Sequence, residues 1–311
     1  MNTKINTYIL LFIALNFLCF CSSSTEHKQS ISDIEDNDSI EKDTIEVPIK
    51  SSQYEQIVIP LDNKIGVPFF YHEKLYGYII EGFEVDNDEH LYFLGGEKSM
   101  IACFDNGNEI FRKEYSEFLP NELHIYGSQL YVFDYKLAKN NLFQLETEQG
   151  QIIDSFPQIT VNSVNNYYFV DSTLITKVFN KQERIDMNTE TAYIKFNLKG
   201  ELSGYTDNRY DLLEEQKPKG DEKFMGYWNN KLVFVKFVYN ENKYEFRLKS
   251  LNNETIKIKS EDLSFFGKPL FGLEGYPEEH RKLRNNKIYV LGRKDENAVI
   301  TILPLEKLFA E

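Results

Sequence analysis

The strongest constraint on the fold is a short pattern that recurs five times along the chain. Each copy begins with a turn rich in Asn, Asp or Gly and continues into a short apolar strand. Tight hairpin turns need residues with positive φ, and these residue types adopt positive φ most readily. The apolar strands are expected at Leu91–Leu94, Leu130–Phe133, Leu174–Thr176, Leu232–Val235 and Ile288–Leu291.

Each copy continues with a polar gap, a further strand and, in four copies, a second turn and another strand. In the first copy, Ile101–Phe104 is followed by the turn Asp105-Asn106-Gly107 and then by Glu109–Phe111. The last copy lacks the final strand, because Ala298–Leu303 runs directly into Pro304. The repeated unit is therefore a set of four short antiparallel strands.

These units predict an all-β fold, a β-propeller of four-stranded antiparallel blades spanning residues 51–311. The first strands of successive copies are spaced by 39, 44, 58 and 56 residues. The apolar segment Gln56–Ile59 precedes the first copy, and we expect it to supply the missing outer strand of the last blade. That pairing would close the ring and remove two exposed sheet edges. An all-β sandwich is the alternative, although it would not repeat the same order of turns and strands.

The composition agrees with strands and limits the partners. The 24 Phe and 20 Tyr suit half-buried strand surfaces. The formal net charge of −14 argues against a nucleic-acid partner, whose phosphates attract basic surfaces. The same charge repels anionic membranes, so membrane association would require a separate attachment.

The first residues supply a candidate for that attachment. Tyr8–Phe20 is an almost unbroken apolar run that is too short for a confident membrane span, so residues 1–20 are expected to be a signal peptide. Leu18 and Cys21 resemble the bacterial lipobox, although Phe20 stands where that pattern has a small residue. Cys21 is therefore the predicted lipidation site. Cys19, an unlipidated cleaved signal and a transmembrane anchor remain alternatives.

Residues 21–50 are expected to form an acidic, disordered tether. From Ser22 to Lys50 there are eight acidic residues and three Lys, so this segment has a net charge of −5. It has no aromatic residue and no sustained apolar period with which to offset the entropy of ordering. If Cys21 carries a lipid, Cys103 is the one remaining cysteine of the mature chain, and we expect it to be a small buried apolar residue.

The repeat and the leader together resemble the NHL- and TolB-like six-bladed propeller lipoproteins of Gram-negative bacteria. The likeness is carried by the unit EVDNDEHLYFLGG…IACFDNGNEIFRK and its copies, and it extends from Tyr54 to the end of the sequence. It implies six blades, whereas five units are evident. A sixth, degenerate blade would lie within Asp62–Ile80 or within Ser260–Glu279, and the length from Tyr54 to Glu311 admits either five or six blades.

Loops on one face of a propeller commonly bind ligands, and they give the candidate site residues. The loops between second and third strands include Gly95–Lys98, and the longest connections between blades are Thr206–Asp221 and Ser260–Glu279. Long connections within a compact domain are often functional. The predicted ligand contacts in these loops are Tyr135, Arg184, Arg209, Tyr239 and Arg293.

No catalytic residue, metal site or cofactor is predicted. Asp86-Asn87-Asp88 begins like a calcium loop, but Leu91 stands where an EF-hand needs Gly, so this segment is interpreted as a turn. The five His show no zinc-ligand spacing, and neither a G-x-S-x-G elbow nor a P-loop occurs.

Two functions remain open at this stage. The first is an exported monomer, held at the outer membrane of the cell envelope by its N-terminal lipid alone, that binds a protein or glycan without catalysis. The alternative is a propeller hydrolase or lyase that acts on a carbohydrate or lactone at the central channel. Converging carboxylates at the axis would favour the enzyme, and an exposed aromatic patch would favour the binding module.

Overall fold

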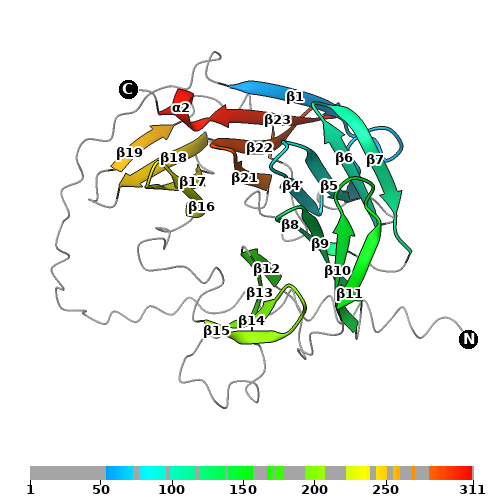
Figure 1. Cartoon of the computed structure of the whole chain (residues 1–311). Helices are drawn as coiled ribbons and strands as arrows, with labels where there is room; N and C mark the ends of the chain where they lie inside the picture. The colour runs from blue at the N-terminus through cyan, green and yellow to red at the C-terminus, as the bar shows by residue number, and fades with distance from the viewer. Residues whose placement is uncertain are drawn as a thin grey trace, which may run out of the picture. The chain divides into compact units, whose positions relative to one another are not determined.

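Five antiparallel sheets, arranged as a β-propeller, make up most of the computed structural model (Figure 1). The chain divides into two units, Met1–Ile40 and Glu41–Glu311, and every residue that the structure describes belongs to the second. The described residues are 54–72, 77–95, 99–116, 120–136, 139–156, 167–170, 172–177, 193–206, 222–238, 243–250, 255–259, 268–269 and 280–309. The expected signal peptide, the expected tether and the predicted lipidation site Cys21 therefore lie outside the described residues.

Four of the sheets consist of four strands that are consecutive in the sequence. The first contains β4 (Gly82–Val85), β5 (Leu91–Gly95), β6 (Met100–Asp105) and β7 (Asn108–Glu114). The second contains β8 (Pro120–Tyr126), β9 (Gln129–Lys136), β10 (Lys139–Glu146) and β11 (Ile152–Phe156). The third contains β12 (Tyr167–Val170), β13 (Thr173–Lys177), β14 (Tyr193–Asn197) and β15 (Leu202–Thr206). The fourth contains β16 (Glu222–Trp228), β17 (Lys231–Val238), β18 (Lys243–Ser250) and β19 (Thr255–Lys259).

The last sheet combines the two ends of the propeller domain. Its strands β20 (Lys268–Pro269), β21 (Arg281–Arg284), β22 (Lys287–Lys294) and β23 (Asn297–Pro304) are joined by β1 (Glu55–Pro60), which pairs antiparallel with β23. In this register Ile57 lies opposite Ile300, and Ile59 lies opposite Ala298. The prediction that an N-terminal strand completes the last blade is confirmed, as Figure 1 shows along the β1–β23 pair.

The first strands of the blades contact one another, as the inner strands of a propeller must. β4 packs against both β8 and β21, β8 also contacts β12, and β21 also contacts β16. These inner strands therefore surround the axis of the propeller, and residues on them are the ones that meet between blades.

The turns of the repeat have the backbone that the sequence predicts. Asn229, Asn230, Asn285 and Asn286 all have positive φ, between 47° and 60°. In the first three blades a glycine with positive φ, namely Gly107, Gly150 or Gly200, lies in the turn before the outer strand, a conformation that glycine adopts without steric cost. In each of these blades the pairing between third and outer strand shifts register a few residues after the turn, and a bulge of this kind increases the local twist of the outer strand. The repeat is therefore visible in the backbone as well as in the sequence.

The apolar core lies between blades, and β5 shows how one strand serves two of them. Leu91 and Phe93 pack toward the last blade, in a cluster with Ile59, Tyr289 and Ile300. The alternate residues Tyr92 and Leu94 pack toward the second blade. Side chains alternate between the two faces of a strand, so a strand buried on both faces is apolar at every position.

Cys103 belongs to the cluster between the first two blades and is fully buried. Its burial raises the pKa of the thiol to about 12, although a hydrogen bond with Tyr92 acts in the opposite direction. The prediction that Cys103 is a buried apolar residue is confirmed. The chain then reaches the short helix α2 (Leu305–Leu308), whose Leu305 and Leu308 pack in the cluster between the fourth and last blades.

The six blades implied by the resemblance are not confirmed. Asp62–Ile80 contributes a two-stranded sheet, β2 (Phe70–His72) paired with β3 (Gly77–Ile79), rather than a blade. Within Ser260–Glu279 the described residues are Lys268 and Pro269, and they pair with β22 of the last sheet. Five blade-like sheets are thus present among the described residues.

Candidate functional site

An aromatic cluster lies on the connection between the last and first blades, beside the end of β22. Phe69 directly precedes β2, Tyr71 lies in β2, and Tyr78 lies in β3. The ring centroids of Phe69 and Tyr78 are 4.7 Å apart, and those of Tyr71 and Tyr78 are 5.5 Å apart in an edge-on arrangement. The guanidinium carbon of Arg293 lies 4.6 Å from the centroid of the Tyr78 ring. We call Phe69, Tyr71, Tyr78 and Arg293 the hairpin patch.

The exposure of the patch suits a contact surface. Tyr71 is 46% exposed, whereas Phe69, Tyr78 and Arg293 are half-buried. Aromatic rings in edge-on contact and a cation over a ring face are mutually attractive, so the four side chains support one another's positions. The partly exposed Tyr71 ring is thus supported by side chains that already pack against one another.

The loop that leads into the patch is held by hydrogen bonds. The Asp62 carboxylate accepts hydrogen bonds from the backbone N–H groups of Lys64 and Ile65, and the first of these lowers the pKa of Asp62. Asn63 Oδ1 accepts from the Phe69 N–H at 2.8 Å. Arg112 donates to the backbone carbonyls of Asn63 and Gly66. The loop is therefore anchored to the first blade before it reaches the rings.

Gly95, at the end of β5, makes room for this loop. A Cβ on Gly95 would lie 2.6 Å from the Pro68 carbonyl oxygen, a distance that real Cβ atoms do not adopt. The loop Gly95–Lys98 is among those that the sequence suggested for the binding face, and residues 96–98 lie outside the described residues. Its first glycine is needed because another backbone segment passes directly against it.

Among the predicted ligand contacts, the structure brings Arg293 into the hairpin patch. Tyr135 lies in β9, opposite Asn140 of β10. Arg184, Arg209 and Tyr239 lie outside the described residues. Their roles in binding all stay predictions. Sequence reasoning did not single out Phe69, Tyr71 and Tyr78, although the density of aromatic residues between Pro68 and Tyr78 was a usable signal.

The inner strands carry a charged cluster that joins three blades. Glu84 of β4 is 3% exposed, and its Oε1 lies 2.5 Å from Lys282 Nζ of β21 and 3.8 Å from His124 Nδ1 of β8. Burial by itself would raise the pKa of Glu84, but Lys282 and His124 outweigh it and hold the pKa at about 2. This carboxylate is thus ionised and paired.

Arg284 strengthens the same junction. Its guanidinium donates to the carbonyl of Val85 on β4 at 3.0 Å and to the carbonyl of Ile125 on β8 at 3.2 Å. The charged residues of these inner strands therefore bind neighbouring blades together, which is a structural use of charge at the axis.

The carboxyl group of Glu81, directly before β4, has a raised pKa, in contrast to that of Glu84. Burial raises the pKa of its carboxyl to about 7. Next to it, His280 Nε2 donates to the Ile80 carbonyl at 3.2 Å. A carboxyl group with a pKa near neutrality can exchange a proton at physiological pH.

The segment Asp86–His90 has the composition of a cation site but is used as a turn. Ligand-type atoms of Asp86, Asp88 and His90 lie within 4.8 Å of one another. The Asp86 carboxylate accepts from the backbone N–H groups of Asp88 and His90, from the Tyr92 hydroxyl, and contacts His90 Nδ1 at 2.9 Å. The Asp86 carbonyl also accepts a hydrogen bond from the Glu89 N–H, so Asp86-Asn87-Asp88 forms the turn that the sequence predicts, and the absence of a metal at this turn stays a prediction.

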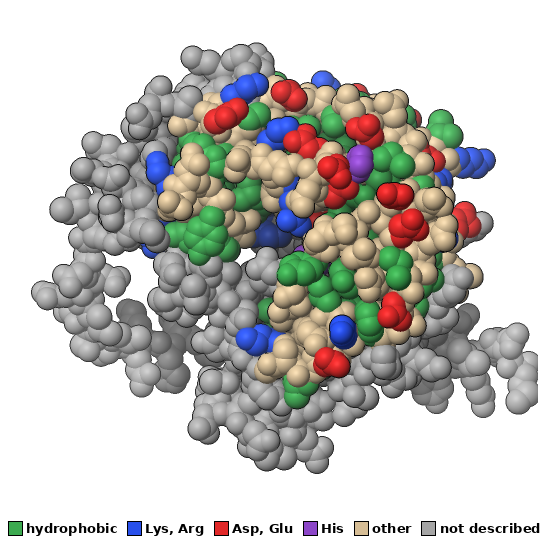
Figure 2. Space-filling view, in the orientation of Figure 1, with side chains coloured by type: hydrophobic (Ala, Val, Ile, Leu, Met, Phe, Trp, Pro, Cys, Tyr) green, Lys and Arg blue, Asp and Glu red, His purple; other side chains and the backbone are tan. Residues whose placement is uncertain are grey.

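Figure 2 shows acidic, basic and apolar side chains interleaved on one face of the molecule. Among helices of the described residues, none has the length and apolar character needed to span a membrane.

Comparison with known proteins does not assign a family. The sequence matches no family model, and a search of curated proteins gave no match. Among solved structures, an aldose sugar dehydrogenase of Streptomyces coelicolor in its PQQ-bound form matches with 9% identity and a TM-score of 0.42, over 80% of this chain and 98% of that one. BamB from Moraxella catarrhalis matches with 11% identity and a TM-score of 0.31, over 80% and 99%. A eukaryotic initiation factor matches with 14% identity and a TM-score of 0.28, and this chain spans 32% of its length.

Proposed function

We propose that this protein is a binding module whose propeller recognises a protein partner through the hairpin patch. The observation that carries the proposal is the patch itself, in which Tyr71 is 46% exposed and rests on Tyr78, while Arg293 covers the same Tyr78 ring. Tyr and Arg are enriched among the residues that dominate the binding energy of protein interfaces. Because the patch is pre-ordered, little conformational entropy is lost when a partner binds.

We also propose that the N-terminal leader attaches this module to the cell envelope. A lipid on Cys21 would hold the chain at the membrane, and the acidic segment 21–50 would separate the propeller from the lipid surface. A partner in the same compartment would then meet a tethered propeller at high local concentration.

Site-specific crosslinking in the native cell tests the proposal. A photo-reactive phenylalanine analogue at Tyr71 is expected to trap one defined protein, and Arg293→Ala in the same chain is expected to remove that product. Tyr126 of β8 is a matched control, because it is also 46% exposed but lies outside the patch. Equal products from both positions, or none from Tyr71, would overturn the proposal.

One observation favours a second candidate function, a hydrolase or lyase acting on a carbohydrate or lactone. The Glu81 carboxyl, with its pKa raised to about 7, has the proton affinity that a general acid needs. Against it, Glu84 on the following inner strand is already ion-paired with Lys282. Release of product from model lactones or glycosides that disappears in Glu81→Gln would favour the enzyme.

A further inference from the structure

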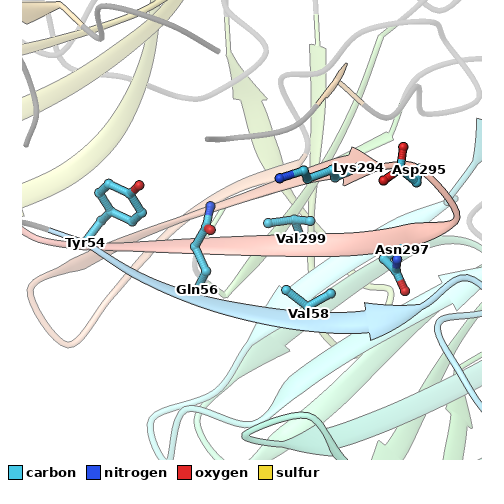
Figure 3. A pocket seen from close by; sticks show the side chains of 7 residues that line it. All are labelled: Tyr54, Gln56, Val58, Lys294, Asp295, Asn297 and Val299. Atoms are coloured by element: carbon cyan, nitrogen blue, oxygen red, sulfur yellow. The ribbon is translucent and has the colours of Figure 1, made fainter. Parts of the chain in front are cut away.

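The turn between β22 and β23 borders two different surfaces. Arg293 lies over Tyr78 in the hairpin patch, whereas the next residue, Lys294, lines a shallow pocket of about 390 Å³ (Figure 3). Successive side chains of a strand point to opposite faces of the sheet. The pocket is therefore a separate feature from the hairpin patch, and its ligand is independent of the proposed function.

The pocket lies across the two outermost strands of the last blade. It is lined by Tyr54, Gln56 and Val58 at the start of the domain and by Lys294, Asp295, Asn297 and Val299 at the β22–β23 turn and along β23. In the strand register Val58 lies opposite Val299. The intervening residues Ala298 and Ile300 are buried toward the first blade, so the pocket residues occupy the other face of the sheet.

The lining combines an apolar floor with polar groups around it. Val299 is 3% exposed and Val58 is 56% exposed, and the two valines form the floor. Figure 3 shows Tyr54 at one end of the pocket and Lys294 with Asp295 at the other. Gln56 Nε2 donates to Thr301 Oγ1 at 3.1 Å, which fixes the position of this amide at the edge of the floor.

The chemistry of the lining defines the class of ligand. One ammonium and one carboxylate balance in charge, so the pocket favours a neutral ligand. Two amides, the ammonium and the carboxylate offer both donors and acceptors, which matches a molecule with several hydroxyl groups. A tyrosine ring beside two valines matches an apolar face on the same molecule.

We propose that this pocket binds a neutral saccharide. The Asp295 carboxylate accepts hydrogen bonds from hydroxyl groups, the Asn297 amide donates and accepts, and the Tyr54 ring covers the C–H face of a sugar ring. Lys294 donates to a further hydroxyl. The volume of about 390 Å³ falls within the range of about 300–1,000 Å³ that small-molecule sites occupy.

The test uses the full-length chain in detergent on an array of neutral oligosaccharides, with sulfated and uronic-acid oligosaccharides for comparison. The chain is expected to be retained by one or more neutral oligosaccharides. The affinity for the best of these is then measured for the variant Asp295→Asn. Asp295 has a φ of 56°, and asparagine tolerates this conformation, so the variant removes the charge and preserves the turn.

Asp295→Asn and Lys294→Ala are each expected to weaken binding about tenfold, because each removes a charge-assisted hydrogen bond. The control Asp154→Asn changes an exposed carboxylate on the outer strand β11 of another blade, and it is expected to bind like the unmodified chain. Retention by charged oligosaccharides alone, no retention at all, or unchanged affinity in both pocket variants would overturn the proposal.

Discussion

Glu84 and Lys282 are 198 residues apart in the sequence, and their side chains join the inner strands of the first and last blades at 2.5 Å. The pair lies at the axis, where the last blade meets the first, whereas the β1–β23 pairing that completes the last blade lies at the outer end of the same sheet. Closure of the chain on itself therefore has two parts, an ion pair at the axis and a strand pairing at the outside.

The ion pair between Glu84 and Lys282 is expected to stabilise the folded protein because the Glu84 carboxylate is buried. Glu84→Gln is expected to lower the free energy of unfolding by about 3 kcal/mol, since it leaves the Lys282 ammonium without its counter-charge. Urea denaturation at neutral pH measures this loss. Glu89→Gln is the matched control, because Glu89 pairs with Lys287 at 2.6 Å between the same two blades but its side chain is 37% exposed, against 4% for Glu84. That variant is expected to cost less than about 1 kcal/mol. Equal losses would contradict the role given to Glu84.

The same ion pair predicts that the free energy of unfolding decreases at acidic pH. The pKa of Glu84 is about 2 in the folded protein and near its ordinary value of 4.5 when unfolded. Its contribution to stability is therefore complete above pH 4.5 and is lost as the pH falls toward 2. The unmodified chain should lose stability over this interval more steeply than Glu84→Gln. Parallel curves of unfolding free energy against pH for the two chains would refute the prediction.

Glu81 predicts the opposite dependence on pH. Burial raises its pKa from 4.5 to about 7, so the folded state holds a proton that the unfolded state releases. The stabilising contribution is complete below pH 4.5 and is lost as the pH rises through 7. Glu81→Gln has an uncharged side chain of similar size at all pH values, and it should be more stable than the unmodified chain above pH 8 by about 3 kcal/mol. Thermal unfolding at pH 5 and pH 8.5 measures the difference, and a variant that is less stable at both pH values would contradict it.

The closing strand β1 can be tested with two neighbouring residues. Ile59 is 1% exposed and packs in the cluster between the first and last blades, whereas Val58 is 56% exposed. Ile59→Ala is expected to lower the free energy of unfolding by about 2–4 kcal/mol in one cooperative transition. Val58→Ala should change it by less than about 0.5 kcal/mol. If β1 were only loosely attached, both substitutions would have the same small effect.

Membrane attachment is tested at Cys21. Cys21→Ala is expected to abolish acylation and to release the protein from membranes in a fractionation experiment. Cys19→Ala should leave it in the membrane fraction. If the Cys21→Ala variant stays in the membrane fraction, the lipid is on Cys19 or the chain has an anchor of another kind.

The sequence predicts the blades well because their determinants are local. Turn residues such as Asn285 and Asn286 need positive φ, and this requirement is visible in the residue types themselves. The closing strand was also predictable, because Gln56–Ile59 is a strand without a partner nearby and the last unit lacks its outer strand.

The sites were less predictable, because they depend on contacts between distant segments. Glu84 and Lys282 have no local pattern that reveals their pairing. The segment Asp62–Ile80 was expected as a possible blade, yet β2 and β3 have three residues each and form a hairpin. The aromatic rings on that hairpin become a patch only when Arg293, more than two hundred residues later, lies over Tyr78.

The central claim is that the hairpin patch binds a protein partner, and an affinity measurement with the protein crosslinked at Tyr71 tests it most directly. With that protein purified, Tyr71→Ala and Arg293→Ala should each weaken binding at least about tenfold, as expected for interface residues that dominate the binding energy. Both variants should keep the melting temperature of the unmodified chain, and Tyr126→Ala should keep its affinity. An unchanged dissociation constant in Tyr71→Ala and Arg293→Ala would contradict the account.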